Sequence, residues 1–264
     1  MDCAGCAVSR CPRMDKIACA SLRKACRLRE WRFNMVHIYA VSITDFPEET
    51  VPRLLSIVTA EKKQRLLAFY HRDDLVRGLL ADLLIRKIAA ERFAVPAKSI
   101  LFGTNAYGKP SLLDPCSRLH FNLSHAGSWV VCITAEHPVG IDIEKKQAID
   151  LQIASQFFAK EECAFIEEEA DSKRRLERFF HVWTAKESYI KAIGKGLFLP
   201  LDSFSTVKEG SVEGWREYEQ GDWFFKTYAL DDDYALTACA QTESFGEKVD
   251  VVPLDSLIAY FHSN

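Results

Sequence analysis

Apolar residues recur every three or four positions in several stretches of the chain, which is the period of an amphipathic helix. Thr59 is a favourable N-cap for the second of these stretches, and Pro96 and Gly194 stand where the third and the last must end. The helices predicted on this basis cover residues 46–58, 59–71, 72–93, 151–170 and 173–193.

Alternation of apolar and polar residues, the period of a strand, begins at residue 36 and returns after the third predicted helix. A hairpin is predicted over residues 118–136, and the turn-forming residues of 101–112 predict a loop before it. The other predicted strands cover residues 36–43, 139–144, 215–220, 222–230, 234–241 and 248–254.

The order strand, helices, strands occurs twice along the chain. This order is typical of an α+β protein, and its repetition predicts two similar halves. We place the boundary near Pro138, with residues 35–138 in the first half and residues 139–264 in the second.

Residues 1–34 show no clear apolar periodicity, and we expect them to form an extension outside the fold. Cys3 and Cys6 have the spacing of zinc ligands, but no second such pair follows, so a zinc site is weakly indicated. The odd total of nine cysteines argues against a disulfide framework. Because the first strand opens at Met35, we interpret Met35 as the natural start of the protein.

The composition is that of a globular protein with a sizeable core, since 48% of the 264 residues are hydrophobic. No apolar run is long enough to span a membrane, and the N-terminus lacks the apolar region of a secretory signal, so we expect a cytoplasmic protein. Residues 1–34 carry a net charge of +5 and the remainder −8. The acidic main body argues against a general nucleic-acid binder.

The last predicted helix carries a carboxylate on its apolar face. At about 100° per residue, Glu187 lies about 40° from Trp183, inside the stripe that also holds Phe180 and Ile190. Burying an unpaired carboxylate is costly, so Glu187 needs a cation, a metal ion or a proton. An ion pair with Lys191, one turn later, is the simplest explanation.

The strand VGIDIE, residues 139–144, carries two more carboxylates. Its period of two puts Asp142 and Glu144 on one face, about 7 Å apart, beside Gly140, which lets a neighbouring group approach closely. The solvated face of an edge strand would also explain this pattern. Together with Glu187, these carboxylates would supply the hard oxygen ligands that suit Mg²⁺, and Lys191 would reach phosphate groups on the metal.

These residues carry a resemblance to a known family. GIDIE at 140–144 and WTAKESYIK at 183–191 are similar to the two signature motifs of the Sfp-type 4′-phosphopantetheinyl transferases, at the spacing found in that family. Further motifs match at FYHRDD (69–74), YGKP (107–110), FNLSHAGSW (121–129) and PLDSF (200–204). The resemblance covers residues 35 to about 255 and leaves residues 1–34 without a counterpart.

The resemblance implies the 4′-phosphopantetheinyl transferase fold, a monomer whose two α+β halves are related by a pseudo-twofold axis. It implies that coenzyme A binds between the halves and that its 4′-phosphopantetheine group is transferred to a serine of an apo peptidyl or acyl carrier protein, releasing 3′,5′-ADP. The carrier proteins implied are those of peptide or polyketide synthesis, as in antibiotic formation, and not those of lysine biosynthesis. No nucleic acid or membrane partner is implied.

The resemblance also implies roles for individual residues. Asp142, Glu144 and Glu187 would hold Mg²⁺ on the pyrophosphate, Glu187 would also take the serine proton, and Lys191 would contact the pyrophosphate. The coenzyme A pocket would comprise Lys109 and Pro110 on the adenine side, Ser124 and His125 at the nucleotide phosphates, and Lys62, Arg65 and Arg77 around the 3′-phosphate. Taken singly, each basic residue would be interpreted as a solvated surface charge.

Two other functions would use the same residues. A Mg²⁺-dependent phosphodiesterase would hydrolyse nucleotides with the same carboxylates and would need no carrier protein. A module that binds coenzyme A or a carrier protein without catalysis would not need Asp142, Glu144, Glu187 and Lys191 intact. Replacing Glu187 by glutamine separates these functions from the transferase, which should lose turnover while still binding coenzyme A.

Overall fold

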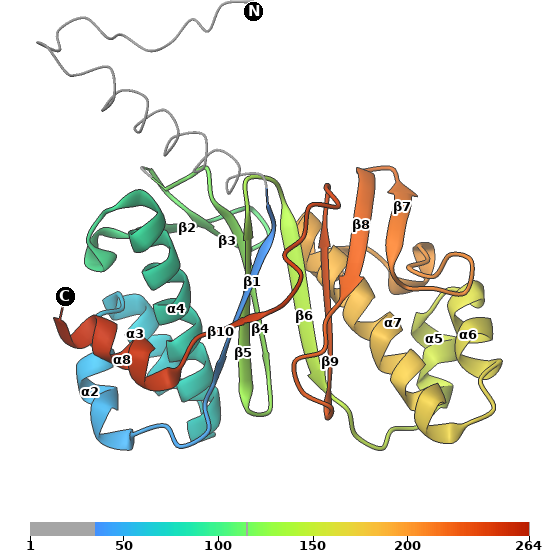
Figure 1. Cartoon of the computed structure of the whole chain (residues 1–264), viewed down its shortest axis with the longest axis horizontal. Helices are drawn as coiled ribbons and strands as arrows, with labels where there is room; N and C mark the ends of the chain where they lie inside the picture. Colours follow the sequence, from blue (N-terminus) through green and yellow to red (C-terminus); the bar gives the residue numbers. More distant parts are fainter. Residues whose placement is uncertain (1–34, 115, 264) are drawn as a thin grey trace, which may run out of the picture. The chain divides into compact units, whose positions relative to one another are not determined.

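Figure 1 shows the computed structural model of the chain, which describes residues 35–114 and 116–263. The predicted extension over residues 1–34, including the Cys3–Cys6 pair, lies outside the described residues. The zinc pattern and the interpretation of Met35 as the natural start therefore stay predictions. No helix in the described part of the chain is both long and apolar enough to cross a lipid bilayer.

The first half is built on a sheet with the strand order β10-β1-β5-β4. These strands are β1 (His37–Ser42), β4 (His120–Ala126), β5 (Trp129–Ala135) and β10 (Asp250–Val251). The helical elements of this half are η1 (Glu48–Thr50), α2 (Val51–Leu54), α3 (Ala60–Leu67), α4 (Arg72–Phe93), η2 (Ala97–Ser99) and α8 (Leu254–Ser263). A small hairpin joins β2 (Phe102–Thr104) to β3 (Pro110–Leu112).

The second half repeats the plan with a sheet of order β6-β9-β8-β7. Its strands are β6 (Val139–Lys145), β7 (Gly214–Tyr218), β8 (Gly221–Thr227) and β9 (Tyr234–Ala240). Its helical elements are η3 (Leu151–Ile153), α5 (Ala154–Phe157), α6 (Lys160–Glu167), α7 (Ser172–Ile193), η4 (Gly196–Phe198) and η5 (Leu201–Ser203). The α+β architecture predicted from the sequence is confirmed.

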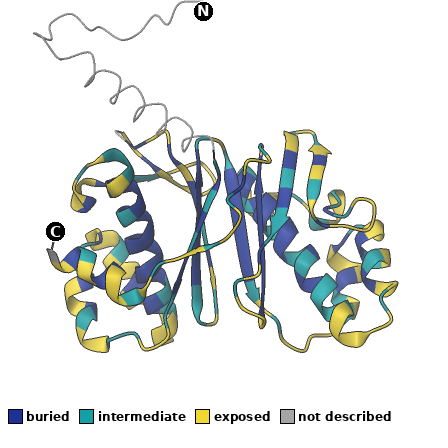
Figure 2. Cartoon of the chain, in the orientation of Figure 1, coloured by how far each residue is buried: buried dark blue, intermediate teal, exposed yellow. Residues whose placement is uncertain are grey.

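Buried apolar side chains form three clusters that alternate with the two sheets (Figure 2). One cluster packs α4 against the first sheet, and another packs α7 against the second sheet. The third lies between the sheets and joins Ile38 and Ile133 of the first half to Ile141 and Leu236 of the second. The two halves are therefore fused through a shared apolar layer.

At the junction, β4 and β6 lie side by side without a described backbone ladder between them (Figure 1). Polar side chains of β4 replace part of that ladder. The Asn122 side-chain oxygen accepts the Ile141 N–H at 3.0 Å, and the Ser124 hydroxyl accepts the Ile143 N–H at 3.5 Å. Buried backbone donors of β6 are thus paired by side chains from the other half.

The long helices are where the sequence places them, but several other segments differ from prediction. The helix predicted over 46–58 forms only the short elements η1 and α2. The helix predicted over 151–170 is divided into η3, α5 and α6, because Phe158 is extended, with φ −104° and ψ 154°. The buried Glu162 carboxylate stabilises this break by accepting the Ala159 N–H at 2.9 Å. The loop predicted over 101–112 contains the β2–β3 hairpin.

The C-terminal segment returns to the first half. Strand β10 pairs in parallel with β1, and α8 buries Leu257, Ile258 and Phe261 in the same cluster as α4. Only residues 250 and 251 of the strand predicted over 248–254 are extended in the sheet, and α8 was not predicted. The division of the chain at Pro138 stays an interpretation of the sequence, to which the structure adds that residues 250–263 pack with the first half.

Candidate active site

A glycine allows α7 to lie directly on β6. A Cβ atom at Gly140 would stand 1.8 Å from the Ser188 carbonyl oxygen and 2.7 Å from the Ala192 backbone nitrogen. Any larger residue would force the helix backbone away from the strand. The close approach expected at Gly140 is therefore made by α7, and it brings the carboxylates of the two motifs together.

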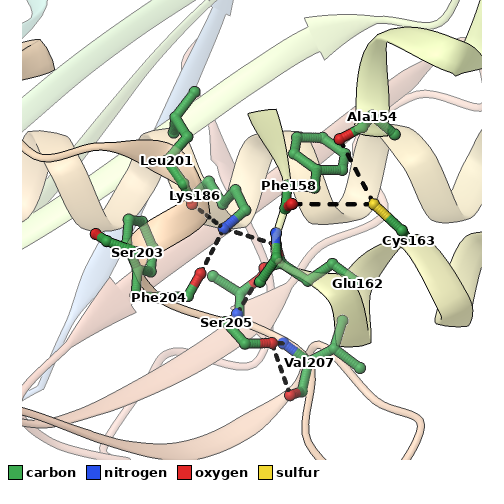
Figure 3. Close-up of polar contacts among 12 residues, drawn as sticks. Ala154, Phe158, Glu162, Cys163, Lys186, Leu201, Ser203, Phe204, Ser205 and Val207 are labelled. Carbon is green, nitrogen blue, oxygen red and sulfur yellow. Dashed lines mark hydrogen bonds and ion pairs between the residues drawn. The ribbon is translucent and has the colours of Figure 1, made fainter. Parts of the chain in front are cut away.

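The neighbouring residues Lys186 and Glu187 point to different sides of α7. Lys186 is fully buried on the core side, where its ammonium donates to the Leu201 and Phe204 carbonyls at 2.6 and 2.7 Å (Figure 3). It also pairs with the buried Glu162 carboxylate at 2.6 Å. These contacts tie α6, η5 and the residue after η5 to α7, and they fix the rotation of the helix about its axis.

Glu187, one residue later, is half-buried and faces a pocket. The pocket has a volume of about 280 Å³ and is lined by Tyr107, Gly108, Lys109, Pro110, Asn122, Glu187, Ile190, Lys191, Gly194 and Gly196. Lys191 follows on the next turn of the helix, and Gly194 ends the helix with a φ of 66°. The sequence expected Glu187 on the buried stripe; the structure places it beside that stripe, at the pocket.

Asp142 lies at the meeting point of β4, β6 and α7. Its carboxylate is buried, and its Oδ1 accepts from the Ser124 hydroxyl at 2.8 Å and from the Lys191 ammonium at 2.5 Å. Lys191 also donates to the Ser124 hydroxyl at 2.9 Å. The second oxygen, Oδ2, is buried without a hydrogen-bond partner among the described residues. A buried carboxylate oxygen without a partner is rare, and its chemistry suits a bound cation.

The carboxylates of the site are electrostatically coupled. Burial, and after it the neighbouring Asp142 carboxylate, raises the pKa of Glu144 to about 7, while Lys191 opposes the rise. Burial and Asp142 also raise the pKa of Glu187, while Lys191 opposes the rise. Burial raises the pKa of Asp142 itself, against the opposing effects of Lys191 and Ser124. Such mutual repulsion favours a cation among these groups.

In the part of the chain that the structure describes, no three His, Cys, Asp or Glu side chains lie close enough together to form a preassembled metal site. The donor set nevertheless fits a hard divalent cation, because it consists of carboxylate oxygens and includes the unpaired Asp142 Oδ2. Asp142, Glu144 and Glu187 would hold such an ion once their side chains turn toward it.

Lys109 reaches the pocket from the first half but contacts the backbone of the second. Its ammonium donates to the Ala192 carbonyl at 2.7 Å and to the Val139 carbonyl at 3.3 Å. Asn105 adds a bond to the Gly194 carbonyl at 2.9 Å. The loop of YGKP is thus anchored to the C-terminal end of α7, where cations are favourable. Burial lowers the pKa of Lys109 to about 8.

Arg77 and His125 lie at the hairpin between β4 and β5. The Arg77 guanidinium donates to the Gly127 carbonyl at 2.7 Å and to Asp74 at 2.6 Å. Partial burial and the cationic Arg77 hold the pKa of His125 below its ordinary value, and Lys191 acts in the same direction. Ser124 and Lys191 are joined by a hydrogen bond, and the charges of Arg77 and Lys191 both act on His125, so we treat these four residues as one polar group.

Lys62 and Arg65 are not drawn into this group. Arg65 is exposed and pairs with Glu61 at 3.8 Å. Burial lowers the pKa of Lys62, which lies near the buried Asp82–Arg86 pair. No hydrogen bond or ion pair described for the chain joins either residue to the pocket. Pro110, by contrast, lines the pocket as the motif predicts.

Three pocket-related residues were missed by the sequence reasoning. Tyr107 and Asn122 line the pocket, and Asn105 anchors its loop. Asn122 could have been found, because an amide within a buried strand must bond to something. Asn105 stood out only as a turn residue, and its partner on α7 is not visible in any local pattern.

The chain matches known proteins over both halves. Residues 138–239 match the family model described as the 4′-phosphopantetheinyl transferase superfamily, and residues 47–137 match the model described as 4′-phosphopantetheinyl transferase, N-terminal. The chain belongs to the 4′-phosphopantetheinyl transferase superfamily and is an enzyme of the transferase class.

Individual relatives support this membership. The chain is 38% identical over 213 residues to 4′-phosphopantetheinyl transferase Sfp of Bacillus subtilis (strain 168), covering 80% of this chain and 94% of that protein. It is 45% identical over 152 residues to 4′-phosphopantetheinyl transferase gsp of Aneurinibacillus migulanus, covering 57% and 62%. It is 32% identical over 228 residues to psf-1 of Bacillus pumilus, covering 84% and 97%. The resemblance read from the motifs is confirmed.

Proposed function

We propose that the enzyme transfers the 4′-phosphopantetheine group of coenzyme A to a serine of an apo peptidyl or acyl carrier protein. The observation that carries the proposal is the buried Asp142, with its unpaired Oδ2, held by Lys191 beside a pocket that Glu187 lines. Phosphoryl transfer requires that negative charge on the phosphate be neutralised, which a lysine can do, and that a proton be removed from the nucleophile, which a carboxylate can do.

In the reaction, the serine oxygen would bond to the phosphorus that carries pantetheine, and the bond from that phosphorus to the bridging oxygen would break. The electron pair would leave with 3′,5′-ADP, and the serine proton would pass to the Glu187 carboxylate. Lys191 would bind the pyrophosphate through its ammonium, exchanging its present contact with Asp142 for one with the substrate.

Asp142, Glu144 and Glu187 would hold Mg²⁺, since their oxygens suit it and Asp142 Oδ2 needs a partner. Bound there, the ion would neutralise charge on the pyrophosphate. The motif resemblance supports a coenzyme A pocket with Lys109 and Pro110 on the adenine side and Ser124 and His125 at the nucleotide phosphates. The basic residues around the 3′-phosphate would be Lys62, Arg65 and Arg77. We propose a monomer that acts in the cytoplasm on carrier proteins of peptide or polyketide synthesis.

Intact mass spectrometry of an apo carrier protein tests the proposal. Incubation with the enzyme, coenzyme A and Mg²⁺ should add the mass of one phosphopantetheine group, and omission of Mg²⁺ should abolish the gain. Glu187→Gln should slow labelling roughly 10²–10⁴-fold while coenzyme A binding, measured by calorimetry, persists.

Glu177→Gln is the matched control, because Glu177 lies on the same helix and pairs with Lys146 at 4.0 Å, away from the pocket. It should label at the wild-type rate. Coenzyme A binding without labelling of any carrier would instead indicate a binding module. Release of adenine nucleotide without labelling would indicate a phosphodiesterase.

A further inference from the structure

The tip of the β4–β5 hairpin is packed against the second half. Its loop is two residues long, Gly127 and Ser128, and Gly127 has a φ of 50°, as tight hairpins require at the first loop position. A Cβ at Gly127 would lie 2.2 Å from the Tyr234 hydroxyl oxygen. The glycine therefore serves both the turn and the approach of Tyr234.

This tip is held by Tyr234, the first residue of β9, and by Asp231 in the loop between β8 and β9. The Tyr234 hydroxyl accepts the Ser128 N–H at 2.9 Å, and Tyr234 is only 8% exposed. The Asp231 Oδ2 accepts the Trp129 indole N–H at 3.0 Å, while its Oδ1 accepts the Asp233 N–H at 3.0 Å and so fixes its own loop. Trp129 is therefore a half-buried hydrogen-bond donor.

The hairpin tip also contacts residues that the resemblance assigns to coenzyme A binding. Arg77 of α4 donates to the Gly127 carbonyl at 2.7 Å, and His125 lies within the electrostatic reach of both Arg77 and Lys191. Ser124, one residue before His125, contacts Lys191 at 2.9 Å. The tip therefore contacts Tyr234 and Asp231 of the second half and also Arg77 of the polar group, whose member Lys191 lines the pocket.

We propose that Tyr234 and Asp231 are positioning residues: they hold the hairpin tip so that Arg77 and His125 stay beside the Ser124–Lys191 contact. This inference rests on the proposed function, in which Arg77 and His125 bind the nucleotide phosphates of coenzyme A. Asp142, Glu144 and Glu187 lie on other elements, so loosening the tip weakens substrate binding and leaves the chemical step intact.

The variant Tyr234→Phe removes only the hydroxyl that accepts the Ser128 N–H. We expect KM for coenzyme A to rise roughly three- to tenfold with kcat within about twofold of wild type, because one half-buried hydrogen bond is lost. KM for the carrier protein should not change.

Tyr228→Phe is the matched control. Tyr228 is 9% exposed, belongs to the same apolar cluster, and donates its hydroxyl to the Gly246 carbonyl at 2.9 Å, away from the hairpin. It should lower the melting temperature about as much as Tyr234→Phe does, with KM for coenzyme A unchanged. Equal KM values for the two variants, or a fall in kcat with unchanged KM in Tyr234→Phe, would overturn the inference for Tyr234.

The variant Asp231→Asn tests the second residue, because its amide oxygen still accepts the Asp233 N–H but its NH₂ group faces the Trp129 indole. Combined with Tyr234→Phe, it should raise KM beyond the single variant; an equal KM would remove Asp231 from the inference. If wild-type enzyme labels no carrier protein, the proposed function fails. Calorimetry with coenzyme A still tests the positioning role of Tyr234 in that case. Weaker binding by Tyr234→Phe than by Tyr228→Phe supports positioning, and equal binding overturns it.

Discussion

Lys186 and Glu187 are adjacent in the chain but lie in different environments. About 100° of helical rotation separates them, so one enters the core while the other faces the pocket. The buried Lys186–Glu162 pair therefore defines where Glu187 points. At the residue scale, the orientation of the proposed base depends on a neighbour that does not touch the pocket.

Gly140 is the residue at which the smallest change should do most damage. Gly140→Ala puts a methyl group 1.8 Å from a backbone oxygen of α7, which cannot move aside as a side chain can. We expect a loss of about 3 kcal/mol or more in the free energy of unfolding, measured by urea denaturation. Gly246→Ala is the control, since its Cβ would meet the nearest atom at 3.4 Å, and it should remain close to wild type.

Lys109 predicts a dependence of stability on pH. Burial lowers the pKa of Lys109 from 10.5 to about 8, so in the pH window between these values the unfolded chain binds a proton that the folded chain has lost. Stability from this group therefore rises as pH increases from about 8 to about 10.5. The melting temperature of wild type relative to Lys109→Met should increase across this window; a constant difference would contradict the prediction.

At the scale of elements, the structure locks α7 in place through contacts at three points along its length. Gly140 of β6 lets the backbone of α7 pack directly on the strand. Lys186 of α7 pairs with Glu162 of α6. Lys109 and Asn105 donate hydrogen bonds to carbonyls at the C-terminal end of α7. Each contact comes from a different element. The face of α7 that carries the proposed base Glu187 is consequently held by partners from both halves of the chain.

Removing the Lys186 ammonium tests how much the buried Lys186–Glu162 pair contributes to stability. Lys186→Met leaves the Glu162 carboxylate buried without its cation, which typically costs about 3–5 kcal/mol. We expect a large fall in the denaturant midpoint. Replacing Lys87, which pairs with the half-exposed Glu91, by methionine should change stability by less than about 1 kcal/mol. Similar losses for the two variants would contradict this account.

The elements that carry the motifs were predictable because their signals are local. Alternation placed β6 at the GIDIE motif, and the helical period with Gly194 placed α7 within a residue of its bounds. The break at Phe158 and the partners of Lys186, Lys109 and Trp129 were not predictable, since each depends on a residue distant in the chain. Helix α8 could have been found from Leu254, Leu257, Ile258 and Phe261, which have helical spacing.

At the scale of the whole molecule, the two halves are fused by the apolar layer between the sheets and by the returning C-terminal segment. Strand β10 completes the first sheet beside β1, and α8 covers part of the first core. The pocket lies where side chains of the first half meet α7 of the second. Both halves must therefore be folded before the pocket exists.

A substitution in the C-terminal helix α8 should destabilise the first half, because α8 packs in its core. Phe261 is 4% exposed in the first core, so Phe261→Ala should cost about 3–5 kcal/mol in the free energy of unfolding. Val251→Ala, at a residue that is 53% exposed in the same segment, should change it by no more than about 0.5 kcal/mol. A small effect of Phe261→Ala in urea titrations would show that α8 is not needed by the first half.

This arrangement also has a consequence in time. A ribosome releases β1 and α4 early, yet the side chains that complete their core are added only with residues 257–261. At about 5–20 residues per second, the first half waits on the order of ten seconds between the synthesis of β5 and that of α8. During that interval the edge of β1 that β10 will cover is open. The order of synthesis thus leaves the nascent enzyme accessible to chaperones at this edge of β1 until β10 has been made.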